Sequence, residues 1–451
     1  MACSQKESCG NTGSPVGREP QGDPPDLREG QTGPGGKSER LIVPKNPGNL
    51  GGGKEPQFKD SARRGEGRGI GKSLPTQSKV GLLQEALHVK AKENPSYRFY
   101  SLYDKIWRED LLGEAWKRCR ANDGVPGVDG VSFQQIEKTG VEPWLGELAK
   151  ELKEKSYRPQ ALKRVWLKKP EGGERPIGIA TVKDRVAQMA AVIVLEPIFE
   201  ADLCEEQYGY RKGRNAHQAV QQIQKALKLG HRDVVDGDLS GYFDNIPHHE
   251  LLKSVARRVS DGAMLKLIRQ WLEMAVEEDD GKGGKRRTTQ ARDNRQGTPQ
   301  GSPLSPLLSN VYMRRFILGW EKLGYRKAYA GKIVAYADDF VILCKAGAAT
   351  AAREAMERIM KVMKLQVNER KTRTARVPEE SFEFLGYRFG VSHSPRGKGN
   401  VIAPQPSKKA IGKITEAISA ETGREHYWKP VEMLVGTLNE KLRGWKAYFQ
   451  V

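Results

Sequence analysis

Two adjacent aspartates, Asp338 and Asp339, stand in the middle of the apolar segment KIVAYADDFVIL, which runs from Lys332 to Leu343. Branched and aromatic residues on both sides predict two short strands joined by a turn at Ala-Asp-Asp. A turn alone can account for the aspartates, because an Asp side chain readily bonds to nearby backbone groups. The alternative is chemical. Two carboxylates held together repel each other unless a cation lies between them, and Mg²⁺ prefers oxygen ligands.

A third aspartate can join this pair. The segment VVDGDLSGYFDNIPHHEL contains an apolar strand that ends in Asp238, which places the carboxylate at the end of the strand and outside the core. If this strand lies beside the hairpin, three carboxylates meet and need counter-charge. Two divalent ions about 3.5–4 Å apart would supply it and would hold the attacking and leaving oxygens of a phosphoryl transfer.

The charge of the chain indicates its class of partner. The 451 residues carry a net charge of +20, and residues 79–451 contain 64 Lys and Arg against 47 Asp and Glu. The excess therefore belongs to the part that we expect to fold, and a basic folded surface favours a polyanionic partner, nucleic acid first. A basic protein without such a partner is the alternative. The length predicts two or three domains.

Other features exclude several classes of protein. The five cysteines are scattered without a C-x-x-C pair, which argues against a disulfide scaffold or a zinc knuckle. The longest apolar run, from Met189 to Leu195, is too short to cross a bilayer, and the N-terminus lacks a signal-peptide core. We therefore expect a cytoplasmic protein that does not contact membranes.

The elements predicted along the chain alternate between helix and strand without a regular βαβ order, which favours an α+β fold around a mostly antiparallel sheet. Residues 1–78 hold 16 of the 49 glycines and predict a disordered leader. SLYDKIWREDLLGEAWKRCRAN predicts one amphipathic helix capped by Ser101. Further expected elements are two strands around the Gly-Gly turn of RPQALKRVWLKKPEGGERPIGI, helices at 183–199, 248–259, 303–323 and 348–365, a helix ending near Gly230, a charged insert at 277–295, and a strand FEFLGYRF.

The order of the motifs resembles the palm of a reverse transcriptase, and most closely the reverse transcriptases encoded by bacterial group II introns. GDLSGYFDNI, QGTPQGSPLSPLLSNVYM and YADD follow one another as the three palm blocks, and the resemblance extends over roughly residues 100–451. A lone Y-x-D-D is weak evidence, whereas its order and spacing with the other blocks are specific. The resemblance implies a right-hand polymerase fold with fingers, an antiparallel palm and a helical thumb.

The resemblance also implies roles for single residues. Asp238, Asp338 and Asp339 would be the catalytic metal ligands, with the backbone carbonyl of Leu239, for two Mg²⁺ ions or Mn²⁺ as a substitute. Basic residues of the fingers would meet the triphosphate of the incoming nucleotide, unless they belong to a solvated hairpin. These basic residues are Lys169 and Arg175.

Further positions match nucleotide-binding parts of the family. Tyr242 or Phe243 would lie under the sugar and exclude a 2′-hydroxyl, although aromatic residues at such positions often only fill the core. Gln300 and Gly301 match the segment that packs on the templating base pair, and Ser302 departs from the glycine of many relatives. Lys371 is a candidate general acid toward pyrophosphate, or a lysine at a helix end without a role. Template phosphates would be bound by Arg211, Lys212 and Arg214.

The implied domains are the leader (1–78), an N-terminal extension (79–150), fingers and palm (151–395), and a thumb that reaches the start of the maturase region and is cut short there (396–451). The implied function is RNA-directed DNA synthesis with an RNA template, a DNA primer, dNTPs and a structured group II intron RNA, as part of a mobile element. The alternatives are a maturase that binds intron RNA without useful polymerisation, and a reverse transcriptase of a defence or diversity-generating system.

Overall fold

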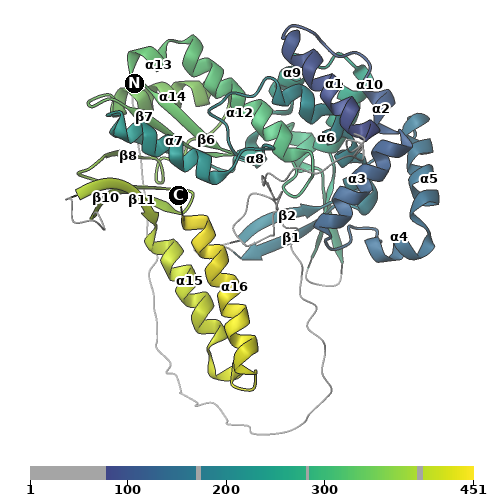
Figure 1. Ribbon diagram of the computed structural model, residues 1–451. Helices are drawn as coiled ribbons and strands as arrows, with labels where there is room; N and C mark the ends of the chain where they lie inside the picture. Colours follow the sequence, from purple (N-terminus) through teal and green to yellow (C-terminus); the bar gives the residue numbers. More distant parts are fainter. Residues whose placement is uncertain (1–77, 169–173, 281–283, 394–399, 451) are drawn as a thin grey trace, which may run out of the picture. The chain divides into compact units, whose positions relative to one another are not determined.

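The central sheet of the protein carries the segments singled out above. In the computed structural model, which describes residues 78–168, 174–280, 284–393 and 400–450, this sheet has the strand order β6-β7-β3-β8 (Figure 1). All neighbouring strands are antiparallel, as the sequence predicts. The strands are β6 (Lys332–Tyr336), β7 (Asp339–Cys344), β3 (Asp233–Gly237) and β8 (Arg373–Arg376).

The two faces of this sheet pack against different helices, because successive side chains of a strand point to opposite sides. Val235 and Ile342 belong to the larger hydrophobic core, which includes α12 (Ser305–Lys322) and α14 (Ala349–Val362). Val234 and Val341 belong to a second core with α7 (Ala216–Lys228). The sheet is therefore covered on both faces, and polar side chains are left at the ends of its strands.

A second sheet has the strand order β2-β1-β4-β5. The antiparallel pair β1 (Leu162–Lys168) and β2 (Glu174–Ile179) confirms the two strands predicted around the Gly-Gly turn, while the turn itself and Lys169 lie outside the described residues. The charged insert also forms strands, β4 (Val276–Asp279) and β5 (Lys285–Thr288). β4 pairs in parallel with β1 and so joins the insert to this sheet.

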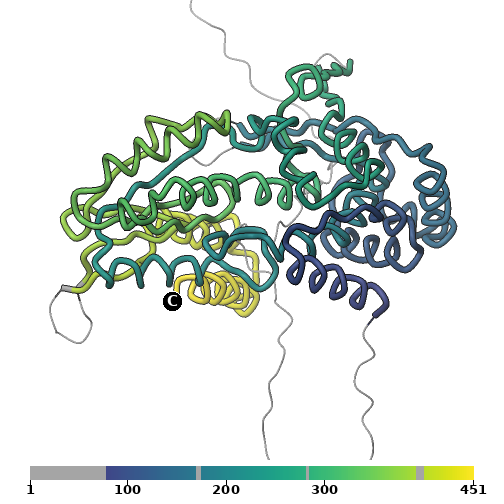
Figure 2. The backbone as a smooth tube through the Cα atoms, turned by 90° about the horizontal axis from the view of Figure 1, so that it is seen from above, coloured from purple at the N-terminus to yellow at the C-terminus, as the bar shows by residue number. Residues whose placement is uncertain are grey.

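Several of the N-terminal helices pack against α6 (Val182–Glu200), which is buried along most of its length. The N-terminal helices, in purple and blue, lie close together in Figure 2. The burial of α6 confirms the mostly apolar helix predicted from Lys183. The helices before it are α1 (Lys79–Glu93), α2 (Tyr103–Ile106), α3 (Glu109–Asn122), α4 (Phe133–Thr139) and α5 (Val141–Lys153). Those between the first and last palm blocks, besides α12, are α8 (Tyr242–Asn245), α9 (His248–Ala256), α10 (Gly262–Leu272), α11 (Gln290–Asn294) and α13 (Tyr325–Ala328).

The prediction of one helix capped by Ser101 is wrong. The segment forms two helices, α2 and α3, and the Ser101 hydroxyl donates to the Asp104 carboxylate. The Asp261 carboxylate accepts the backbone N–H groups of Leu102 and Tyr103, which fixes the first helix from another part of the chain. Arg108 is extended between the two helices.

The C-terminal part begins with a small antiparallel sheet of β9 (Phe382–Phe384), β10 (Tyr387–His393) and β11 (Asn400–Pro406). FEFLGYRF is therefore a hairpin and not the single predicted strand, because Leu385 and Gly386 both have positive φ and reverse the chain. The β10–β11 pair spans the boundary expected at 395. Two helices, α15 (Lys408–Glu421) and α16 (Val431–Phe449), follow and pack side by side (Figure 1).

Two further expectations concern the leader and membrane-spanning segments. The leader at 1–78 lies outside the described residues, apart from Ser78. Among the helices of the described ranges, none combines the length and the apolar composition that crossing a bilayer requires.

Candidate active site

The hairpin that contains Asp338 and Asp339 turns through two residues. Tyr336 pairs with Asp339, and the turn consists of Ala337, with a φ of +59°, and Asp338. Asp338 therefore lies at the tip of the hairpin, and Asp339 is the first residue of β7. The predicted hairpin is confirmed, and the two carboxylates occupy different positions in it.

Asp238 directly follows β3 at the same end of the sheet. The register pairs Gly237 with Phe340, so Asp238 comes next to the start of β7. A Cβ atom at Gly237 would lie 2.4 Å from the Phe340 ring, so this contact requires glycine. The backbone of Asp238 is also held from the other side: its carbonyl accepts from the Asn368 N–H at 2.8 Å, and its N–H donates to the Thr372 hydroxyl at 3.2 Å.

The electrostatics of the site show an excess of negative charge. Burial raises the pKa of Asp338, and the charge of Asp238 adds to this effect while Arg175 opposes it. Solvent reaches part of Asp339, but the surrounding protein reduces the hydration of its carboxyl group. This loss of hydration, followed by the charges of the neighbouring aspartates, raises its pKa to about 7, and Lys371 acts against the rise. The carboxylates are therefore close enough to repel one another.

Asp236 belongs to the same group of charges. Burial raises its pKa to about 6, Arg373 opposes this, and Asp238 and Glu383 add to it. Asp236 and Asp238 are two residues apart on an extended chain, so they share a side of the sheet. A fourth carboxylate thus contributes to the negative potential at this edge.

The chemistry of these donors fits a divalent cation. Carboxylate oxygens are hard ligands, and their repulsion is relieved by a cation. The antiparallel bridge between Leu239 and Val367 uses the Asp238 carbonyl and the Ser240 N–H, so the Leu239 carbonyl is not consumed by it. Within the described ranges, however, no three acidic, His or Cys side chains are already gathered at the spacing of metal ligands.

Arg175 and Gln300 connect the second sheet to this site. The Arg175 Nε donates to the Gln300 Oε1 at 2.9 Å, and the Gln300 Nε2 donates to the Asp244 carboxylate at 3.1 Å. The charge of Arg175 also acts on Asp338. Two predicted nucleotide-binding residues therefore lie together beside the carboxylates, with Asp244 as a partner that the sequence did not indicate.

The backbone around Gly301 approaches β2 closely. Gly301 has a φ of +105°, and a Cβ atom there would lie 2.7 Å from the Gly178 carbonyl oxygen. The adjacent Gly178 N–H donates to the Gln300 carbonyl at 2.9 Å. Ser302 donates its buried hydroxyl to the Gln188 Oε1 at 2.7 Å. The Ser302 hydroxyl therefore has a structural role here.

The two aromatic candidates differ in their surroundings. Tyr242 is 2% exposed and its hydroxyl donates to the Ser309 carbonyl at 2.8 Å, while Phe243 is 7% exposed. Burial raises the pKa of Tyr242 far above its usual range. The rings pack edge to face with centroids 5.6 Å apart. Tyr242 thus anchors α8 to α12, and Phe243 has no such hydroxyl to hold it.

Three basic residues of the loop before α7 have different environments. Arg211 is internal: its side chain is 5% exposed, and it donates to the Glu200 carboxylate at 2.6 Å and to the carbonyls of Cys204 and Gln207. Lys212 is exposed. The Arg214 guanidinium lies 5.4 Å from the centre of the Tyr208 ring. No local pattern in the sequence indicates the partner of Arg211.

Sequence reasoning also missed Tyr210 and Thr372. Burial raises the pKa of Tyr210, with Asp338 adding to the rise and Arg175 opposing it, so this phenol lies near both. Thr372 follows the predicted Lys371 and holds the Asp238 backbone. Tyr210 directly precedes the predicted Arg211, as Thr372 follows Lys371, but nothing in their spacing distinguished either residue from its neighbours.

Known proteins are similar to this chain in sequence. Residues 167–389 match the family described as Reverse transcriptase (RNA-dependent DNA polymerase). Protein YkfC of Escherichia coli is 31% identical over 368 residues, which cover 73% of this chain and 93% of the relative. Group II intron-encoded protein LtrA of Lactococcus lactis is 31% identical over 52% of this chain, and the match spans 38% of LtrA.

Other similarities cover smaller parts of the chain or are weaker. Nuclear intron maturase 2 of Arabidopsis thaliana is 29% identical over 24% of this chain and 15% of its own length. A solved chain of the partial Cas6-RT-Cas1–Cas2 complex is 27% identical, covers 59% of this chain and 43% of that chain, and has a TM-score of 0.35. With the family match and the near full-length match to a relative above 30% identity, the chain belongs to the reverse transcriptases of the group II intron-encoded type, which are RNA-directed DNA polymerases.

Proposed function

We propose that this chain extends a DNA primer on an RNA template, with Asp238, Asp338 and Asp339 holding two Mg²⁺ ions. The observation that carries the proposal is the position of Asp238, directly after β3, beside the hairpin of Asp338 and Asp339 at one end of the sheet. Burial, and after it the charges of neighbouring aspartates, raises the pKa values of Asp338 and Asp339 there. Such a cluster needs cations, and family members generally use divalent ions. The bound ions would align the attacking primer hydroxyl with the leaving pyrophosphate.

The residues of this chain would divide the remaining tasks. Arg175 offers a planar fork of donors to the triphosphate and is already oriented by Gln300. Lys371 would donate a proton toward pyrophosphate. Phe243 would close the sugar pocket, since the hydroxyl of Tyr242 is committed to α12. Lys169 lies outside the described residues and belongs to the same proposal from the sequence alone.

The decisive experiment is primer extension with an annealed RNA template, a DNA primer, dNTPs and Mg²⁺. We expect synthesis by the parent and none by Asp338→Asn, with RNA binding retained in both. Asp104→Asn serves as the matched control, since Asp104 is exposed and bonds to the neighbouring side chains of Ser101 and Lys105. Continued synthesis by Asp338→Asn would refute the proposed role. The same assay with MnCl₂ tests the substitute ion.

A second proposed function is binding of structured intron RNA. It is supported by the intron-encoded relatives and by the excess of Lys and Arg in residues 79–451. Lys212 is the proposed phosphate contact of the loop before α7, because Arg211 is occupied by Glu200. Lys212→Ala should weaken RNA binding and lower the salt dependence by about one counterion. Equal affinity for intron and unrelated RNA would contradict a specific intron role.

The proposed domains follow the same division. Helices α1–α5 form the N-terminal extension, β1 to β10 the fingers and palm, and β11 to α16 the thumb and the start of a maturase region. The relatives LtrA and the intron maturases are longer than the matched segment, so splicing and intron mobility are proposals for the whole element.

A further inference from the structure

A short segment before the loop of Arg211 lies against the edge of the catalytic hairpin. The Tyr208 N–H donates to the Ala335 carbonyl at 2.8 Å, and the Ala335 N–H donates to the Glu206 carbonyl at 2.8 Å. Gln207 and Ala335 thus form a parallel β-bridge. Because β6 is the edge strand of the central sheet, this segment of residues 206–209, here named the buttress, acts as a partial fifth strand.

The buttress also contacts the turn of the hairpin. A Cβ atom at Gly209 would lie 2.5 Å from the Ala337 nitrogen and 2.9 Å from the Tyr336 carbonyl carbon. Only glycine permits this approach. The Ala337 backbone is in the left-handed region, which L-residues other than glycine adopt only when their surroundings hold them there. The position of Gly209 therefore restricts where Asp338, the next residue of the turn, can lie.

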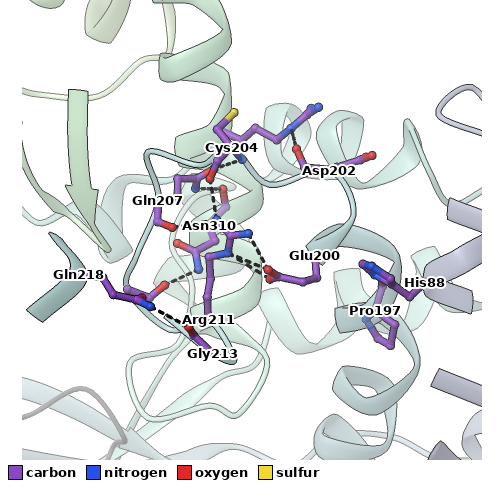
Figure 3. A network of polar contacts seen from close by, with 12 residues as sticks. His88, Pro197, Glu200, Asp202, Cys204, Gln207, Arg211, Gly213, Gln218 and Asn310 are labelled. Atoms are coloured by element: carbon purple, nitrogen blue, oxygen red, sulfur yellow. Dashed lines mark hydrogen bonds and ion pairs between the residues drawn. The ribbon is translucent and has the colours of Figure 1, made fainter. Parts of the chain in front are cut away.

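Two buried amides hold the buttress against α12 (Figure 3). The Gln207 Nε2 donates to the Asn310 carbonyl at 2.9 Å, and the Asn310 Nδ2 donates to the Gly209 carbonyl at 2.8 Å. Gln207 is 1% exposed and Asn310 is 2% exposed. Arg211, paired with Glu200, donates to the Gln207 carbonyl from the other side at 2.8 Å. The buttress is therefore fixed to a helix by directional bonds and not by apolar packing alone.

The same turn of α12 also holds the other half of the site. The Ser309 carbonyl accepts the Tyr242 hydroxyl, and Tyr242 follows Asp238 by four residues. Neighbouring positions of one helix thus bind the segment after Asp238 and the buttress behind Asp338. A helix turn is a rigid unit, so it relates two carboxylates that are 100 residues apart in the chain.

We propose that Gln207 and Asn310 are positioning residues for DNA synthesis, acting through Gly209 and the Ala337–Asp338 turn to set Asp338 against Asp238. The inference rests on the proposed role of these carboxylates as metal ligands. Its physical basis is that a displacement of about 1 Å in a catalytic group can reduce the rate by about 10²-fold. If the amide pair had only a structural role, its substitution would lower stability and leave the turnover of the folded protein unchanged.

Three variants address different parts of this chain of contacts. Gly209→Ala pushes the turn directly, Asn310→Leu removes the donor to the buttress, and Gln207→Leu removes the reciprocal bond. Gln84→Leu is matched to the last, because the Gln84 Nε2 also donates to a backbone carbonyl, that of Ile193 at 3.0 Å, between helices outside the site. Gly113→Ala is matched to the first, since a Cβ atom there meets nothing within 4 Å.

For each variant we would measure kcat, KM for dNTP, affinity for the template–primer, the unfolding midpoint, and Mn²⁺ binding to the free protein by electron paramagnetic resonance. We expect Gly209→Ala and Asn310→Leu to lower kcat by about 10- to 100-fold. Mn²⁺ should bind several-fold more weakly, and template–primer affinity should stay within about twofold of the parental value. Both control variants should keep the parental kcat and Mn²⁺ affinity.

The inference is overturned if the folded variants keep parental kcat and Mn²⁺ affinity while only their unfolding midpoints fall. Should Asn310→Leu not fold, Gly209→Ala and Gln207→Leu decide the question in the same way. The Asp338→Asn experiment distinguishes a failure of the proposed carboxylate role from a failure of the positioning role. If that variant still synthesises DNA, the proposed carboxylate role fails, whereas its inactivity together with fully active buttress variants refutes only the positioning role.

Discussion

The ammonium group of Lys371 lies 4.0 Å from the Oδ2 atom of Asp238, between the end of β3 and the loop that leads into β8. The lysine side chain is 63% exposed, so solvation weakens this ion pair and its contribution to stability is small. Its position is nevertheless favourable for chemistry, because a proton donor stands beside a proposed metal ligand on the open side of the site.

Replacing Lys371 tests whether it donates a proton. Lys371→Ala should lower kcat by about 10²- to 10⁴-fold, the usual contribution of a general acid, with a smaller change in KM for dNTP. Lys371→Arg should not restore the rate, since a guanidinium keeps its proton. Steady-state kinetics on an RNA template measure both, with the exposed Lys361→Ala of α14 as control. Full rescue by arginine would leave only an electrostatic role.

Gly301 should tolerate no side chain. Gly301→Ala places a Cβ atom 2.7 Å from the Gly178 carbonyl oxygen at a φ of +105°, so we expect a loss of about 1–3 kcal/mol in unfolding free energy and a higher KM for dNTP. Gly113→Ala, in the open middle of α3, should instead stabilise by about 0.5–1 kcal/mol. Urea unfolding of the two variants gives opposite signs if this reasoning holds.

Substitutions of Phe243 and Tyr242 should have different effects, on sugar selection for Phe243 and on stability for Tyr242. Phe243→Val should raise the kcat/KM for an rNTP relative to its dNTP, because a smaller side chain admits a 2′-hydroxyl. Tyr242→Phe should leave that ratio unchanged and cost about 1 kcal/mol in stability, because the Ser309 carbonyl loses its buried donor. Single-nucleotide incorporation assays report the ratios. A changed ratio in Tyr242→Phe alone would reverse the assignment.

Asp261 should make stability depend on pH. Burial alone would raise its pKa, but the backbone N–H groups of Leu102, Tyr103, Ala263 and Met264 bond to its carboxylate and together lower it. The stabilisation is therefore complete above the unfolded-state pKa of about 3.9 and is lost as the pH falls through the lower folded-state value.

Removing the charge of Asp261 should make the unfolding free energy depend less on pH in the acid range. Asp261→Asn should be less stable than the parent at pH 7 by about 1.5–3 kcal/mol, the usual value of hydrogen bonds to a charged group, and the difference should shrink below about pH 4. Urea unfolding between pH 3 and 7 measures it. Asp104→Asn, at an exposed carboxylate, should show the parental dependence, and parallel curves for Asp261→Asn would contradict the argument.

Several features could be predicted from the sequence because they depend on neighbours in the chain. The hairpin around Asp338 follows from short apolar strands on both sides of a turn, and the end of β3 before Asp238 follows from the apolar run that stops there. The β1–β2 pair and α6 were predicted for the same reason. The family followed from the order of the motifs, which no single motif could establish.

Other features depend on contacts between distant segments. The start of α2, before the break that separates it from α3, is bound by the Asp261 carboxylate, about 160 residues away. The internal position of Arg211 depends on its ion pair with Glu200. From the sequence, Leu385 and Gly386 could either continue a strand or form a turn. In the structure they form a turn, because β9 pairs with β10. Local preferences are weaker than such tertiary contacts.

The sequence by itself determined which side chains this protein can use, three acidic groups at strand ends and a basic surface for a polyanion, because residue type and local periodicity are enough for that. Only the tertiary structure decided how they are held. The pairing of Gly237 with Phe340 and the bond of Asn310 to Gly209 join segments about 100 residues apart, and the bond of Ser309 to Tyr242 joins segments 67 residues apart. Such pairings arise from burying specific donors and acceptors together, which no local pattern encodes.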